Sequence, residues 1–327
     1  MWGVSVVEDG ALSTLGRLAL DAARVGAGVV RAALADGRFT VTQKTSPRDL
    51  VTEVDHAAEN EIRGFLRRHR PHDAVLGEES GQQAGRTGVR WIVDPIDGTA
   101  NFVRGRTDFA VAVAAEISGE ARVGAIVRPA SGEWAACDET GRVAGSGLVA
   151  VSRTERLDQA LVSVSVSVSA DRRDISFGLL QHLLPEIQDF RRTGSTSCDL
   201  LSVATGQLDA YIGVGTRPWD ISPGWALVGA AGGRCLTLPA GHDVFVVGTP
   251  VVVDSLAPLV EQHLQNPEVT ASQGSTVAAH RAAQAFPRGT DVNDELRDGL
   301  PSPAAEPGRG AAARPPRAPR EPPGESR

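Results

Sequence analysis

The sequence is poor in aromatic residues and has no excess of positive charge. Aromatic residues make up 4% of the 327 positions, so Val, Leu and Ala must supply most of any core. The net charge is −7, whereas a general nucleic-acid binder needs surplus Lys and Arg against the phosphate backbone. We therefore expect no nucleic-acid partner, although bound metal ions would still let an acidic protein hold an anionic phosphate.

Cysteines are few, and long apolar runs are absent. Cys137, Cys198 and Cys235 are widely spaced and form no metal-type pair, which favours small buried side chains in a reducing compartment over a disulfide framework. Residues 1–10 contain no basic segment followed by an apolar run, so no secretion signal is expected there. No apolar stretch is long enough to span a bilayer. These absences predict a cytoplasmic protein without a membrane partner.

The composition changes sharply after Gln265. Residues 266–327 hold half of the 20 Pro residues, amid Ala, Gly, Arg and Glu, and such a segment can bury little against the entropy of ordering. We predict a catalytic domain over residues 1–265 and a Pro/Ala/Arg-rich disordered tail over 266–327. The arginines of the tail could contact an acidic partner, but a solvated tail without a function is the favoured interpretation.

Hydrophobic periodicity predicts helices and strands in irregular alternation, which is typical of layered sheets and helices. Helices are predicted over 12–34, from a capping box at 52–55 through 68, and over 176–184, 199–205 and 221–231. Strands are predicted over 89–93, 109–117, 121–127, 161–169, 208–214, 245–247 and 251–253, and the second and third of these form a hairpin. No internal repeat is present.

Four groups of acidic residues stand out along this pattern: Asp55, Glu78-Glu79, Asp94 with Asp97, and Asp220. The densest of these groups, Asp94 with Asp97, follows a predicted apolar strand, and Pro95 is expected to force a turn between the two carboxylates. Magnesium prefers carboxylate and carbonyl oxygens, so Asp94, Asp97 and the Ile96 carbonyl could share one ion. The amide N–H groups of Gly98 and Thr99, at a helix start, would suit a phosphate oxygen.

Each of these acidic groups also has a structural interpretation. Asp97 and Asp220 could be helix N-caps, and Asp55 could be the acidic member of a capping box. The pair Glu78-Glu79 could be an exposed loop. Taken singly, Asp55 and Glu79 are better explained by a structural role, and Asp220 fits either role. Asp94 with Asp97 is better explained by a metal site. All the acidic groups taken together favour a metal site.

Four segments together resemble the inositol monophosphatase family of magnesium-dependent, lithium-sensitive sugar phosphatases. They are KTSPRDLVTEVD at 44–55, GEES at 77–80, WIVDPIDGTANF at 91–102, and Trp219-Asp220 followed by AAGG at 230–233. All four occur in family order with suitable separations across residues 12–264. The resemblance implies an alternating α-β-α-β-α layered fold and a phosphatase that uses two or three Mg²⁺ ions.

The resemblance also implies roles for individual residues. Glu78, Asp94 and the Ile96 carbonyl would hold the first magnesium; Asp94, Asp97 and Asp220 would hold the second, and Glu78 would help a third through water. Asp55 would hydrogen-bond Thr99, and this pair would orient or deprotonate the attacking water. The Gly98 and Thr99 amides would hold the phosphate, and the segment Gly194-Ser195-Thr196 matches the family's substrate segment, although Ser195 and Thr196 could instead cap the following helix.

The sequence departs from the family pattern seven residues before Asp220. The family commonly has a Glu there, which binds substrate hydroxyls, and this chain has Gly213. Losing polar contacts to a substrate hydroxyl can change discrimination by large factors. Arg217, nearby, could meet a second negative group on the substrate or simply be a surface residue.

The prediction for function is therefore hydrolysis of a small phosphate monoester, inositol monophosphate or a similar polyol phosphate, by a metal-activated water. Histidinol phosphate, fructose bisphosphate and adenosine bisphosphate are alternative substrates. A non-catalytic, metal-binding regulatory protein of the same fold is an alternative of another class. The resemblance leaves a homodimer open, because the family is often dimeric.

Overall fold

The computed structural model describes residues 11–44, 49–167, 169–239 and 243–265. The segment 266–327, for which a disordered tail is predicted, lies outside the described residues. None of the described helices combines the length and the apolar character that a bilayer span requires.

Two helices form the first layer, α1 (Thr14–Asp36) and α2 (Glu53–His69). The N-cap of α1 is Ser13, whose side chain accepts from Gly16 N, and the helix ends at Gly37 with φ 67°. The predicted capping box starts α2, because the Thr52 hydroxyl accepts from the first-turn amides and Asp55 accepts from Thr52 N. Both predicted helices are confirmed.

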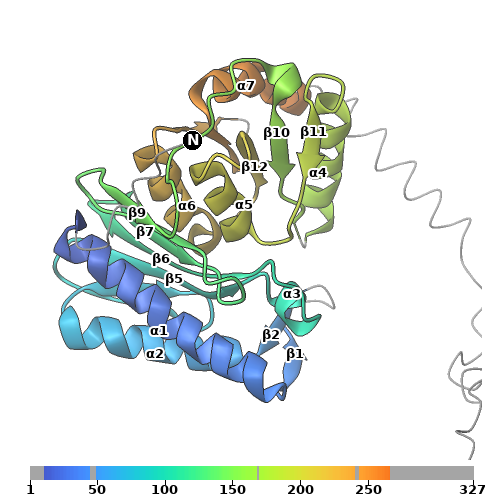
Figure 1. The fold of residues 1–327 in the computed structure, drawn as a ribbon. Helices are drawn as coiled ribbons and strands as arrows, with labels where there is room; N and C mark the ends of the chain where they lie inside the picture. The colour runs from blue at the N-terminus through green and yellow to red at the C-terminus, as the bar shows by residue number, and fades with distance from the viewer. Residues whose placement is uncertain (1–10, 45–48, 168, 240–242, 266–327) are drawn as a thin grey trace, which may run out of the picture. The chain divides into compact units, whose positions relative to one another are not determined.

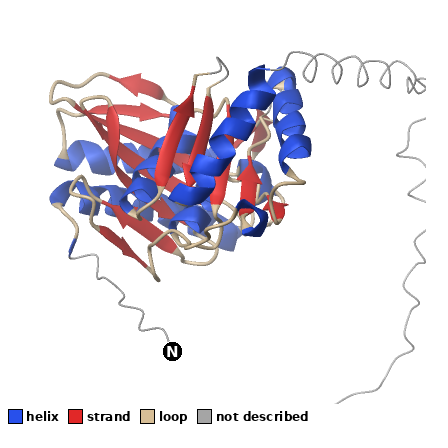
Figure 2. Cartoon of the chain, turned by 90° about the horizontal axis from the view of Figure 1, so that it is seen from above, coloured by secondary structure: helices blue, strands red, loops and turns tan. Residues whose placement is uncertain are grey.

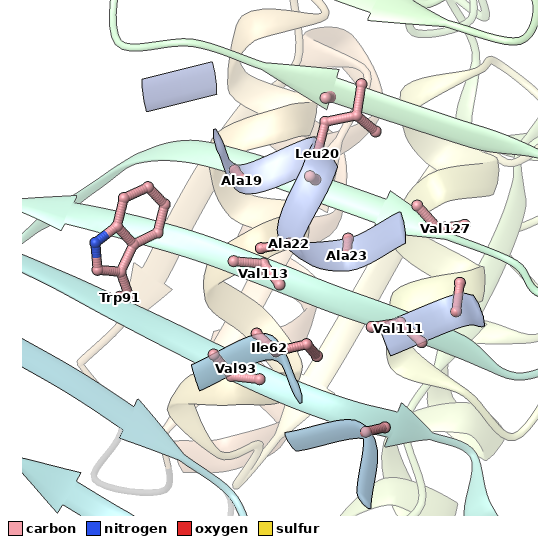
Figure 3. Packing of buried hydrophobic residues seen from close by; sticks show 14 of the residues in the cluster. Ala19, Leu20, Ala22, Ala23, Ile62, Trp91, Val93, Val111, Val113 and Val127 are labelled. Carbon is pink, nitrogen blue, oxygen red and sulfur yellow. The ribbon is translucent and has the colours of Figure 1, made fainter. Parts of the chain in front are cut away.

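The second layer is a seven-stranded sheet against which α1 and α2 pack (Figure 1). Its order is β4 (Gly81–Gln83), β3 (Ala74–Gly77), β5 (Val89–Asp97), β6 (Ala110–Ile117), β7 (Glu120–Val127), β8 (Trp134–Cys137) and β9 (Val143–Gly145). All neighbours are antiparallel except β3 and β5. Figure 3 shows members of the core cluster between the layers, including Leu20 of α1, Ile62 of α2, and Val93, Val111 and Val113 of the sheet.

The remaining layers lie on the other face of this sheet (Figure 1, and turned by 90° in Figure 2). The third layer contains α5 (Thr196–Ala204) and α6 (Pro218–Ala230). The fourth is a five-stranded sheet in the order β11 (Asp189–Arg191), β10 (Leu161–Val164), β12 (Ala210–Val214), β14 (Val244–Gly248) and β13 (Arg234–Leu238). The last contains α4 (Ala170–Leu183) and α7 (Pro250–Gln265). The predicted α-β-α-β-α architecture is confirmed. Three hydrophobic clusters join the layers: one lies between α1, α2 and the first sheet, one surrounds α5 and α6 between the two sheets, and one lies between the second sheet and α4 and α7.

Smaller elements complete the described part of the chain. They are the hairpin of β1 (Val41–Gln43) and β2 (Leu50–Thr52), the short α3 (Thr99–Val103), and a 3₁₀ turn at Leu157–Gln159. The predicted hairpin of β6 and β7 turns at Ser118 and Gly119, both with positive φ.

Two strand predictions need correction. Val251–Val253 is the first turn of α7, not a strand; Pro250 opens the helix, and Val253, Leu256 and Val260 bury one face of it. The predicted strand over 161–169 ends at Val164, because Ser165 Oγ accepts from Val214 N at 2.8 Å and replaces the ladder there. Short apolar runs do not distinguish a strand from a buried helix turn.

Candidate functional site

The site is built around the end of β5, which differs from the predicted turn. The strand continues through Pro95 to Asp97, with a register shift against β6 between Asp94 and Asp97. Gly98 then caps α3 with φ 93°, and a Cβ on this residue would lie 3.0 Å from the Asp108 carbonyl oxygen. The irregular strand end therefore presents both carboxylates together, and a glycine is required directly after them.

Asp220, in the first turn of α6, joins these two carboxylates. One ligand atom from each of Asp94, Asp97 and Asp220 lies within 4.8 Å of the others. Asp220 also accepts from Arg217 N at 3.0 Å, so its N-terminal capping role and its place in the cluster coexist. The N-terminal end of α5 fixes the Asp97 carboxylate, because Asp97 Oδ2 accepts from Ser195 Oγ at 2.9 Å and from Ser197 N.

The carboxylates of this cluster are buried or half-buried and repel one another, so a bound cation would stabilise their charged forms. Burial raises the pKa of Asp94 well above its ordinary value, and the charges of Glu78, Asp97 and Asp220 raise it further. Burial and Asp97 raise the pKa of Asp220 to about 8. The buried Asp94 Oδ1 has no hydrogen-bond partner among the described atoms. An all-oxygen donor set with an unsatisfied buried carboxylate oxygen fits a hard divalent cation such as Mg²⁺.

Glu78 follows β3 and lines the same cavity as the three aspartates. Burial raises its pKa to about 7, against the opposing charge of Lys44. The Lys44 ammonium donates to Glu78 Oε1 at 2.8 Å and also to Glu79. The pair Glu78-Glu79 is therefore not an exposed loop, and Lys44 is a neighbour of the site that was not among the predicted site residues.

Asp55 and Thr99 meet as expected for a pair. Thr99 Oγ1 lies 3.1 Å from Asp55 Oδ1 and 3.0 Å from the Ile96 carbonyl oxygen, and its proton goes to one of the two. Asp55 is buried, and its other oxygen serves the capping box of α2. The capping role of Asp55 is therefore compatible with the predicted role in the site, since the two would use different oxygens.

The predicted substrate segment borders the same cavity, which has a volume of about 250 Å³. Gly194, Ser195 and Thr196 all line it, together with Gly98 and Thr99. Ser195 caps α5, because its hydroxyl accepts from Cys198 N at 3.1 Å while it donates to Asp97. The structure places Arg217 in a neighbouring cavity instead.

Sequence reasoning missed Glu59 in α2, which is fully buried. Its carboxylate accepts from Glu79 N at 2.7 Å and Ser80 N at 3.0 Å, and thereby fixes the turn that carries Glu78. A Cβ at Gly77 would lie 2.3 Å from Glu59 Oε1, so this approach requires glycine there. Because Glu59 stands among polar residues of an amphipathic helix, its sequence context gives no sign of burial.

Asp199 of α5 was also missed and lines the cavity. Its carboxylate accepts from Ser163 Oγ at 2.7 Å on β10 and from Thr193 N and Oγ1 at 3.2 and 2.8 Å. These contacts fix the strand-to-helix segment that includes Ser195. Thr193 in turn accepts from the Asn101 amide through its carbonyl, which ties this segment to α3.

We expect Asp199→Asn to be more stable than the native protein at pH 7 and equally stable near pH 4. Burial raises the pKa of Asp199 from 3.8 to about 6, against the hydrogen bonds from Ser163 and Thr193. The folded state therefore holds the proton more tightly than the unfolded state, and stability is lost as the pH rises from about 4 to about 6, by about 3 kcal/mol in full. An asparagine does not titrate, and its amide can still meet both partners.

Urea unfolding at several pH values between 4 and 7 tests this expectation. The matched control is Asp254→Asn, on the exposed side of α7. A stability difference between Asp199→Asn and the native protein that does not change with pH would contradict the argument.

Comparison with known proteins agrees with this geometry. The profile of the inositol monophosphatase family matches residues 11–283. An inositol-1-monophosphatase of Mycobacterium leprae is 37% identical over 238 residues, covering 68% of this chain and 81% of the relative. A protein named Nus factor SuhB from Escherichia coli is 34% identical over 213 residues, covering 64% of this chain and 79% of the relative.

The solved structures give the same result. Mycobacterium tuberculosis SuhB superimposes with a TM-score of 0.65 at 31% identity, covering 76% of this chain and 96% of that one. An extragenic suppressor protein suhB from Bartonella henselae has a TM-score of 0.69 at 26% identity, covering 76% of this chain and 98% of that one.

Proposed function

Because the chain belongs to the inositol monophosphatase family, we propose that it is a metal-dependent phosphatase for small phosphate monoesters. The observation that carries this proposal is the cluster of Asp94, Asp97 and Asp220 in one cavity with Thr99, whose hydroxyl lies 3.1 Å from the buried Asp55 carboxylate behind it. A cation site alone would need only the cluster. The adjoining hydroxyl–carboxylate pair adds a group that can handle a proton.

The residues that would hold magnesium are Glu78, Asp94, Asp97, Asp220 and the carbonyl of Ile96, with two or three ions as the proposed number. When bound, the ions would supply an acidified water and positive charge against the phosphoryl oxygens. Two of the carboxylates are held in place without an ion, Asp97 by Ser195 and Ser197 and Asp220 by the Arg217 amide. Little reorganisation of the side chains is then needed on binding.

Asp55 and Thr99 would orient the attacking water. When the Thr99 hydroxyl donates to Asp55 Oδ1, its lone pairs are free to accept a hydrogen bond from a water in the cavity, so that the water's proton could pass to Thr99 Oγ1 as the Thr99 proton moves to Asp55 Oδ1. Asp55 is held by Thr52 N through its other oxygen, so it would keep a fixed direction while it receives the Thr99 proton. Glu78, which also lines the cavity, would contribute a further carboxylate to the water's surroundings.

The phosphate and the leaving group would occupy the two ends of the cavity. We propose that the amides of Gly98 and Thr99 donate to the phosphate, and that Gly194 and Thr196 face the alcohol part of the substrate. Ser195 has its hydroxyl engaged with Asp97, so its contribution would be through its position at the wall. The proposed substrate is inositol monophosphate or a similar polyol phosphate. Histidinol phosphate, fructose bisphosphate and adenosine bisphosphate are the alternatives.

A regulatory role without turnover is the second candidate, since some relatives carry the name Nus factor SuhB. The Asp55–Thr99 pair favours the enzyme. A protein that only binds metal has no use for a hydroxyl poised on a carboxylate next to the ions.

Release of inorganic phosphate from a panel of polyol and sugar phosphates tests the proposal. We expect turnover with Mg²⁺ and none after chelation with EDTA. Folded, magnesium-binding protein that hydrolyses no member of the panel would overturn it and favour the regulatory role.

We expect millimolar lithium to inhibit this turnover, because a small cation would compete at the site of Asp94, Asp97 and Asp220. The initial rate at fixed Mg²⁺ should fall with LiCl and stay constant with KCl at equal ionic strength. Equal rates in the two salts would count against the second of the proposed magnesium sites.

We expect Glu59→Gln to weaken magnesium activation by about 10–100-fold, as is usual when a group supporting a metal ligand is lost. One carboxylate oxygen faces each of the amides of Glu79 and Ser80, and the glutamine would turn an N–H₂ group toward one of them. The magnesium concentration for half-maximal rate should rise more than the maximal rate falls. The control is Glu61→Gln on the exposed face of the same helix; an equal change in both variants would show that Glu59 does not position the site.

A further inference from the structure

A second cavity adjoins the proposed active site. It has a volume of about 410 Å³ and shares four wall residues with the first cavity: Ser165, Val166, Thr196 and Asp220. A substrate whose phosphate lies at the carboxylate cluster would therefore extend its leaving group past Thr196 into this space. Nothing in the proposed hydrolysis itself requires this second cavity.

Two arginines line the second cavity, Arg172 of α4 and Arg217 at the start of α6. Arg172 is fixed by donating to the Gly215 carbonyl oxygen at 2.9 Å, and its only acidic contact among the described residues is the exposed Asp243 at 3.4 Å. Arg217 makes no ion pair within the described part of the chain. Both guanidinium groups thus have donors left for a ligand.

Three helices also begin at this cavity. Ser169 is the N-cap of α4, Thr196 is the first residue of α5, and Arg217 is the N-cap of α6, and all three line the wall. The N-terminal end of each helix carries partial positive charge, which favours an anion. The helix ends therefore add to the field of the two arginines.

The wall offers almost nothing for a cation. Asp220 is the single acidic residue among the described residues that line it, and in the proposed function its carboxylate faces a metal ion. Most of the other lining residues carry hydroxyls, and these are Ser165, Ser167, Ser169, Thr196 and Thr216. The Oγ1 of Thr216 is buried and has no hydrogen-bond partner among the described atoms. A polar, cationic wall of this kind suits a hydrogen-bonding anion.

We infer that the second cavity binds a second anionic group, a phosphate or a carboxylate, on the leaving group of the substrate. This inference rests on the proposed function. It assigns the chain to substrates such as a polyol bisphosphate or a phosphorylated sugar acid. A leaving group that carries an amine, as in histidinol phosphate, would meet two arginines and three helix N-termini and is disfavoured by charge.

The test compares three substrates of one carbon skeleton: a hexitol 1-phosphate, the hexitol 1,6-bisphosphate, and the 1-phosphate of the corresponding sugar acid. With magnesium, kcat/KM should be at least about tenfold higher for one of the two doubly anionic substrates than for the monophosphate, a ratio typical of one charge-assisted contact. The bisphosphate and the acid together show which anion is preferred. Equal values for all three substrates would overturn the inference and leave the proposed function intact.

Arginine variants locate the effect. Arg217→Gln and Arg172→Gln should each reduce the ratio of doubly to singly anionic kcat/KM by about tenfold, and Arg217→Lys should keep part of it. Arg234→Gln on β13, which removes the same charge outside the cavity, should not change the ratio. Arg217 is exposed, so its variant keeps the test valid if Arg172→Gln fails to fold. A ratio that Arg217→Gln leaves at the native value would contradict the assignment, and hydrolysis of none of the three substrates would overturn the proposed function and the inference with it.

Discussion

Asp94→Asn is expected to reduce magnesium-dependent phosphate release by about 10²–10³-fold or more, the usual loss when a group that organises transition-state charge is removed. The same substitution should stabilise the metal-free protein at pH 8 by about 1–3 kcal/mol, because it removes a buried carboxyl group that ionises freely in the unfolded chain and is left without a hydrogen-bond partner on Oδ1 in the folded one. Asp94 is fully buried, its Oδ1 has no hydrogen-bond partner among the described atoms, and Asp97 and Asp220 surround it. Loss of activity together with gain of stability is the signature of a carboxylate kept for a cation.

Thermal unfolding with EDTA and with Mg²⁺ measures both effects. Magnesium should raise the melting temperature of the native protein and have little effect on Asp94→Asn. The control is Asp158→Asn, in an exposed ion pair with Arg156. A metal-free Asp94→Asn protein that is less stable than the native one would indicate a structural role for this residue.

Thr99→Val is expected to reduce kcat by about 10²–10⁴-fold, the range typical of a lost acid–base group, while magnesium binding stays near its native strength. Valine keeps the shape of threonine but removes the hydroxyl that lies 3.1 Å from Asp55 Oδ1. The metal ligands are unchanged by this substitution, so the rise in melting temperature with magnesium should persist.

Two further variants separate the proton-handling role from structure. Thr99→Ser retains a hydroxyl and should recover most of the activity. Asp55→Asn should lose activity like Thr99→Val and, in addition, lose about 0.5–2 kcal/mol of stability, because Asp55 also belongs to the capping box of α2. If Thr99→Val keeps native kcat, the pair does not orient the water.

The parts of the site that follow from local sequence were predictable. Asp94 and Asp97 stand next to a strand end and a glycine, and the capping box at Thr52 and Asp55 is a local pattern with one geometry. The resemblance to a family placed Asp220 with them, although 123 positions separate it from Asp97. Hydrophobic periodicity similarly gave most helices and the hairpin of β6 and β7.

The parts that depend on tertiary contact were not predictable from pattern. Glu59 is a glutamate in an amphipathic helix, and its burial becomes evident only when the turn at Glu79 packs on it. Asp199 has the appearance of a first-turn acid until Thr193 and Ser163 close around it. Val251–Val253 has the composition of a strand, but packing of Val253 and Leu256 against the second sheet makes it helical. The segment 266–327 is outside the described residues, so its predicted disorder stays a prediction.

The central claim is that the carboxylates of Asp94, Asp97 and Asp220, with Glu78 nearby, hold divalent cations in the cavity at the end of β5. A crystal structure grown with Mn²⁺ in place of magnesium, with its anomalous difference density, tests this claim most directly. We expect anomalous peaks within coordination distance of Asp94 that are shared with Asp97 and Asp220. Density that shows well-ordered side chains here without any anomalous peak, at manganese concentrations that support turnover, would contradict the account.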